Sequence, residues 1–140
     1  MGVIFAALPP IHATIQESYM LRRTHLQAAE SIDMLRSNNL KKYTDVFTSD
    51  GERIGVTMRF VHRPIEDVNE NLRLYRSYLV IQSIVLGGLT YIPTVYIDTY
   101  DAQGNRLNLS ATLSTLEDEL WNREPDFVVR GLGVFEELPE

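Results

Sequence analysis

The stretch from 50 to 56, Asp-Gly-Glu-Arg-Ile-Gly-Val, most constrains what this chain can fold into. Its Asp-Gly pair predicts a tight turn, because Gly51 reaches the positive φ that such turns require. Four apolar side chains then alternate with polar residues or glycine: Ile54, Val56, Met58 and Phe60. A period of two residues predicts a β-strand over 53–62 with one face in the core and the other outside.

Several more short β segments follow this strand. A Gly87-Gly88 pair predicts a hairpin turn, and Pro64 and Pro93 are expected to end strands because proline lacks a backbone N–H donor. The expected extended segments are 43–48, 53–62, 72–86, 89–92, 95–100, 106–110 and 127–135. Short strands joined by glycine turns favour a mostly-β fold, a small barrel that closes and leaves no sheet edge exposed.

The chain divides into two parts, 1–41 and 42–140. The first part is predicted to be a tail plus an α-helix from the capping box at Thr14 to a left-handed stop at Asn38-Asn39. The second part is the β domain with a short helix near its end, which begins at a second capping box, Ser114 to Glu117, and stops before Pro125. Both parts fit one domain with a terminal appendage in 140 residues.

The N-terminal helix carries two apolar stripes rather than one. Candidate self-association residues on these stripes are Tyr19, Leu21, Leu26, Ile32 and Leu35. A helix with two apolar sides usually packs on two neighbours, which here are its own β domain and a second copy. Two other readings stay open: the helix lies only on its own barrel, or it is an extension ahead of an alternative start at Met20 or Met34.

Charge and composition exclude several partners. The net charge is −6, and residues 42–140 alone carry −7, so the main domain repels phosphate and is not expected to bind nucleic acid directly. The expected partners are an unknown protein and a second copy of the chain. The sequence has no cysteine, and its apolar N-terminal run is too short to be a membrane span. These features favour a cytoplasmic protein without a membrane span.

No catalytic, cofactor or metal-binding motif is found. The three histidines, His12, His25 and His62, are not spaced as metal ligands. His62 with Glu66 and Asp67 is a weak candidate for a metal or acid–base site, and a solvated loop is the preferred interpretation. The expectation is therefore a protein that is not an enzyme, with no catalytic residues, no cofactor and no metal.

The β part resembles the PRC-barrel family over about residues 42–122. The resemblance rests on the 50–55 turn, on Tyr91-Ile92-Pro93 with Val95 and Ile97, and on 107–110 leading into a short helix. It implies that the shared positions are structural turn and core residues: Asp50, Gly51, Ile54, Gly55, Ile92, Pro93 and Leu109.

The resemblance implies a small stand-alone binding or assembly module. The family includes the cytoplasmic domain of the photosynthetic reaction-centre H subunit and a domain of a ribosome maturation factor. Two alternatives remain beside a self-associating module that engages a protein. One is an adaptor in ribosome maturation or RNA processing that acts through protein contacts, and the other is a small-molecule-binding barrel.

Overall fold

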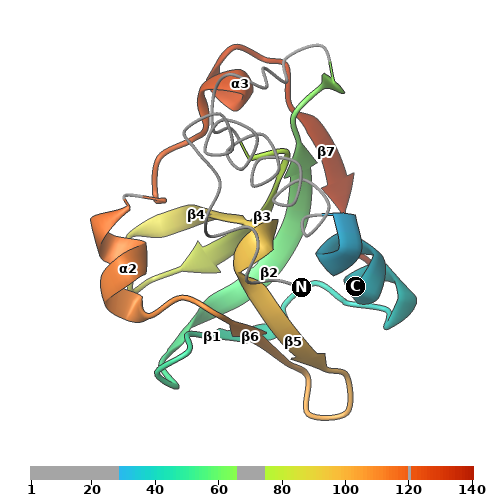
Figure 1. Cartoon of the computed structure of the whole chain (residues 1–140), viewed down its shortest axis with the longest axis vertical. Helices are drawn as coiled ribbons and strands as arrows, with labels where there is room; N and C mark the ends of the chain where they lie inside the picture. Colours follow the sequence, from blue (N-terminus) through green and yellow to red (C-terminus); the bar gives the residue numbers. More distant parts are fainter. Residues whose placement is uncertain (1–28, 66–74, 120) are drawn as a thin grey trace, which may run out of the picture.

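The computed structural model describes residues 29–65, 75–119 and 121–140, which are coloured in Figure 1. Within these ranges the chain is mostly β, as the sequence predicts, and contains no helix long and apolar enough to cross a membrane. A helix over 29–37 comes first. The remaining elements are β1 Asp45–Phe47, β2 Arg53–His62, β3 Ser77–Ser83, β4 Gly88–Pro93, η3 Thr94–Tyr96, β5 Ile97–Asp101, β6 Arg106–Leu109, α2 Leu113–Asp118, α3 Asp126–Val129 and β7 Val134–Glu137.

The strands form one sheet in the order β4-β3-β2-β1-β6-β5, and β7 pairs with β2 off this path. All the pairings are antiparallel except that of β1 with β6. The ten-residue β2 organises the sheet, since its first half pairs with β1 and its second half with β7. Figure 1 shows β2 as the long strand that runs from the lower part of the molecule up beside β7.

The sheet is not closed into a barrel, which corrects the expected closure. The path ends at β4 and β5, and no ladder joins these two strands in the part of the chain that the structure describes. Instead, η3 separates them, and the free edge of β4 is taken by another segment: the Tyr91 N–H donates to the carbonyl of Trp121 at 2.8 Å. The Trp121 carbonyl, from the segment after α2, thus takes one hydrogen-bonding position on this edge.

The predicted alternation along β2 is also corrected. The bounds of the strand match the prediction, but register shifts occur at Ile54 against β1 and at Met58 against β3. A β-bulge adds one residue and so reverses which face the following side chains occupy. As a result, Gly55 and Thr57 are buried while Val56 and Met58 are only partly buried.

Two apolar clusters lie on opposite faces of β3, whose residues are buried on both sides. The larger cluster contains Leu79 and Ile81 and extends to the 29–37 helix through Ile32 and Leu35. The smaller one contains Tyr78 and is covered by Phe127 of α3. The described part of the N-terminal region therefore shares its core with the sheet.

Turn predictions are met where glycine or asparagine adopts positive φ, at Asn39 (57°), Gly51 (84°) and Gly87 (92°). The C-terminal prediction is wrong in part. Residues 127–135 were expected to be extended, yet α3 occupies Asp126–Val129 and only β7 is a strand. Proline before a helix has the φ that a helix entry requires, and Pro125 is the N-cap of α3.

Candidate functional site

The residues predicted to be structural occupy turns and core positions. Ile54, Ile92 and Leu109 are buried in the main cluster, and Pro93 is the last residue of β4. Asp50 accepts hydrogen bonds from the Thr48 hydroxyl and from the Leu113 N–H, which ties the 50–55 turn to the start of α2. The Thr48 hydrogen bond, above all, lowers the pKa of the Asp50 carboxyl below its ordinary value.

Of the five residues predicted to mediate self-association on the N-terminal helix, the structure describes two, Ile32 and Leu35. Ile32 is 5% exposed and Leu35 is fully buried, both within the chain's own main cluster, so neither offers a surface to a second copy. This corrects the assignment of these two residues, because both side chains pack against the sheet. Tyr19, Leu21 and Leu26 lie outside the described residues, as do His12, His25, Glu66 and Asp67.

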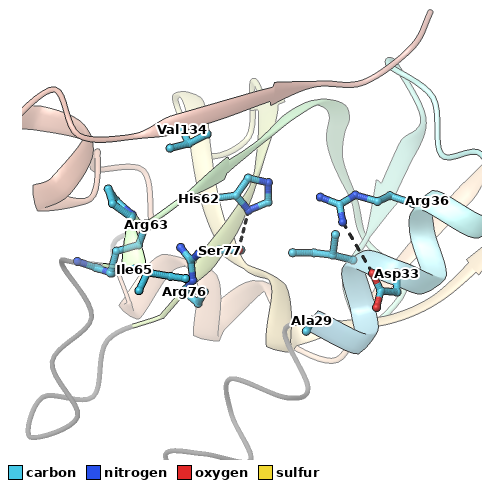
Figure 2. A pocket seen from close by; sticks show the side chains of 11 residues that line it. Ala29, Asp33, Arg36, His62, Arg63, Ile65, Arg76, Ser77 and Val134 are labelled. Atoms are coloured by element: carbon cyan, nitrogen blue, oxygen red, sulfur yellow. Dashed lines mark hydrogen bonds and ion pairs between the residues drawn. The ribbon is translucent and has the colours of Figure 1, made fainter.

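A pocket of about 570 Å³ lies between the 29–37 helix, the end of β2, the start of β3 and β7 (Figure 2). Its polar side chains come from the helix (Asp33 and Arg36) and from the paired strand ends. Its apolar walls are Ala29, Ile32, Pro64, Ile65 and Val134. The remaining lining residues are His62, Arg63, Arg76 and Ser77. The volume is within the range of small-molecule sites.

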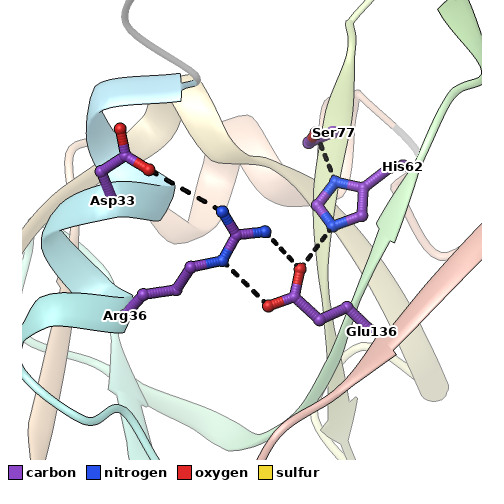
Figure 3. A network of polar contacts seen from close by, with 5 residues as sticks. All are labelled: Asp33, Arg36, His62, Ser77 and Glu136. Carbon is purple, nitrogen blue, oxygen red and sulfur yellow. Dashed lines mark hydrogen bonds and ion pairs between the residues drawn. The ribbon is translucent and has the colours of Figure 1, made fainter.

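A chain of polar contacts runs beside this pocket, across three neighbouring strands and onto the helix (Figure 3). His62 Nδ1 lies 2.8 Å from Ser77 Oγ, and His62 Nε2 lies 2.8 Å from Glu136 Oε1. Arg36 donates to both oxygens of Glu136 and contacts Asp33 at 3.7 Å. These contacts fix the helix to β7 and β2.

The charge state of Glu136 sets the tautomer of His62. Hydrogen bonding to Arg36, followed by that to His62, lowers the pKa of Glu136 below its ordinary value. An ionised carboxylate only accepts, so the Nε2–H of His62 donates to Glu136, and in the neutral form of the ring Nδ1 then accepts a hydrogen bond from the Ser77 hydroxyl. Each contact from Ser77 through His62 and Glu136 to Arg36 therefore joins a hydrogen-bond donor to an acceptor.

Ser77, His62 and Glu136 are the residue types of a hydrolytic Ser–His–acid arrangement. In this fold Ser77 is only 3% exposed and stands directly opposite His62 in the β2–β3 ladder. The hydrogen bond between them is thus a cross-strand contact. These contacts therefore serve as a structural link between the strands. The sequence did not reveal them, because His62 is 15 residues from Ser77 and 74 residues from Glu136.

We expect Glu136→Gln to lower the free energy of unfolding by about 1 kcal/mol at pH 7, since both partners are partly solvated. The pKa of Glu136 is depressed in the folded state, so its contribution is present above the unfolded value of about 4.5 and is lost as pH falls below it. Urea unfolding at several pH values would therefore show the gap to wild type shrinking in acid. Glu52→Gln, at an exposed position, is the control and should change stability little; a gap that persists unchanged below pH 3 would contradict this role.

A second surface feature is a run of exposed apolar residues along α3 and β7, Val129, Leu132, Val134 and Phe135, which we call the α3–β7 patch. Within β7, Val134 lines the pocket and Phe135, the next residue of the strand, is on the opposite face. Among the described strands, β7 pairs only with β2, so its other edge has no strand partner. Sequence reasoning expected 127–135 to be a weak extended segment and missed the patch. The only available signal was the run of apolar residues without a period of two.

Acidic residues on β7 are paired within the chain. Glu137 accepts from Arg59 at 2.7 Å and lies 3.8 Å from Lys42, while Glu136 is held by Arg36 and His62. In the described ranges, no three His, Cys, Asp or Glu residues group as metal ligands would.

Comparisons with known proteins give no further guide: no family model matches the chain, and neither a curated protein nor a solved structure shows a significant match.

Proposed function

We propose that this chain is a non-enzymatic binding and assembly module, related to the PRC-barrel type by its 50–55 turn although its sheet is open, which self-associates and engages a protein partner. The observation that carries the proposal is the α3–β7 patch beside the free edge of β7. The family type is supported by the 50–55 turn, in which Gly51 has positive φ and Gly55 lies against the next strand.

An unpaired strand edge is a template for another strand. If β7 pairs antiparallel with β7 of a second copy, the same surface serves both subunits and the dimer closes. Phe135 is 53% exposed, and with the other patch residues it would be covered in such a pairing. Covering these side chains supplies the hydrophobic driving force.

Charge also permits this pairing. A chain of net charge −6 repels its copies, and β7 contributes Glu136 and Glu137 to the contact. Both carboxylates are already compensated by cations of the same chain. The second copy would therefore meet ion pairs rather than bare like charges, which are destabilising when directly opposed.

The test is Phe135→Lys, which places a charge at an exposed position of β7 within the α3–β7 patch. We expect light scattering after size exclusion to show a dimer for wild type and a monomer for Phe135→Lys, with unchanged circular dichroism. Ile84→Lys is the matched control, because Ile84 is an exposed apolar residue (93%) on the β3–β4 turn. It should leave the dimer intact.

A wild-type monomer at concentrations of about 100 µM would refute self-association through β7, and so would a Phe135→Lys variant that stays dimeric. Deletion of the helix is a poor test, because Ile32 and Leu35 belong to the core and their loss would unfold the chain.

A further inference from the structure

The pocket beside His62 has the opposite charge balance to the rest of the protein. The chain as a whole carries −6, but the described lining of the pocket contains three arginines, Arg36, Arg63 and Arg76, and one acid, Asp33, with Glu136 paired to Arg36 beside it. A concave, partly apolar site with local positive charge concentrates anions. The lining therefore selects for a ligand of negative charge.

The three arginines are not equivalent. Arg36 is held by Glu136 and Asp33. Arg63 donates to the Tyr75 carbonyl at 2.9 Å, and its guanidinium lies 4.4 Å from the centre of the Phe127 ring. Arg76 is different, because its Nη1 is buried and has no hydrogen-bond partner.

A buried guanidinium nitrogen without a partner is costly, and most buried polar groups in native structures have one. Arg76 lines the pocket and is only partly buried as a whole, so an anion in the pocket would lie beside its positive charge. Ser77 is the next residue in the chain and His62 pairs with it, so polar groups already lie next to this position. Figure 2 shows Arg76, Ser77 and His62 together on one side of the pocket and Arg36 with Asp33 on the other.

The rest of the lining is apolar. Ile32, Pro64, Ile65 and Val134 offer only hydrocarbon to a ligand, and Ile65 and Val134 are exposed at the rim. A simple inorganic anion would leave these apolar side chains in contact with water. The volume of about 570 Å³ is also far larger than such an ion needs.

We propose that this pocket binds a small amphipathic carboxylate, with the carboxylate beside Arg76 and an aliphatic body against Ile32, Pro64 and Ile65. The pocket shares Val134 with the α3–β7 patch, but Phe135, the residue that tests self-association, does not line it, so the two proposals are tested at different residues. The charge and the apolar body are both required, and neither alone supplies enough contact.

Three probes separate these contributions: octanoate has both parts, 1-octanol has only the aliphatic body, and acetate has only the charge. We expect octanoate, titrated below its micelle concentration, to shift the methyl resonances of Ile32, Ile65 and Val134. Acetate and 1-octanol should bind at least tenfold more weakly. Arg76→Gln should weaken octanoate binding at least tenfold and leave 1-octanol binding unchanged.

Arg53→Gln is the matched control, because Arg53 is an exposed arginine paired with Asp45 on the far half of β2. It should bind octanoate like wild type. The proposal is overturned if octanoate leaves the pocket methyl groups unshifted at millimolar concentration. It is equally overturned if Arg76→Gln and Arg53→Gln bind octanoate alike, or if 1-octanol binds as well as octanoate does.

Discussion

Gly55→Ala is expected to lower the free energy of unfolding by about 3 kcal/mol, because a methyl group has no room at this position. A Cβ on Gly55 would lie 2.1 Å from the carbonyl oxygen of Gln82 and 2.9 Å from its carbonyl carbon. Both atoms belong to the backbone of β3, so no side-chain rotation relieves the contact. The strands would have to separate where β2 is paired on both edges, with β1 and with β3.

Denaturant unfolding followed by circular dichroism measures this effect. Gly104→Ala is the matched control, since its added Cβ would meet only the side chain of Asp101 in an exposed turn. The Asp101 carboxylate accepts from the Gln103 and Gly104 N–H groups in this exposed turn, so moving it costs at most these solvent-accessible hydrogen bonds, and we expect a change of no more than about 1 kcal/mol. Equal stabilities for the two variants would show that β2 and β3 do not approach as closely at Gly55 as described.

Leu35→Ala is expected to cost about 3 kcal/mol of unfolding free energy, within the usual range for a fully buried leucine. Leu35 has no exposed surface and joins the 29–37 helix to the main cluster. Its loss leaves a cavity between the helix and the sheet. The helix lies on its own domain, so the effect should appear equally at low and high protein concentration.

The concentration dependence makes this result diagnostic. If Leu35 stabilised only a dimer, the difference in unfolding midpoint between wild type and Leu35→Ala would shrink as the protein is diluted. Ser37→Ala, at an exposed position of the same helix, is the control and should shift the midpoint little. A small, concentration-dependent effect of Leu35→Ala would contradict this prediction and would indicate that the helix packs on a second copy, as its two apolar stripes suggest.

The candidate site was the part least accessible from sequence. His62 was singled out, but with Glu66 and Asp67, its neighbours along the chain. The partners that the structure gives it are Ser77 and Glu136, which reach it through strand pairing. Arg76 carried no signal at all, since the lack of a partner for its Nη1 is a property of packing.

Local chemistry by itself determined the turns and the ends of the strands. A glycine at positive φ, a proline without an N–H and a left-handed asparagine act within a few residues, so Gly51, Pro64 and Asn39 could be placed from the sequence. The mostly-β character followed from the same short-range pattern.

Only the tertiary structure decided which faces and edges are used. The two bulges in β2 change which side chains are buried, and the Trp121 carbonyl occupies the edge of β4 that closure of the sheet would need. Likewise Ile32 and Leu35, which belong to one apolar stripe of the N-terminal helix, are buried in the core, while α3 and β7 carry the exposed patch. These outcomes depend on competition between segments far apart in the chain for the same hydrogen bonds and apolar surface, and no window of sequence contains both competitors.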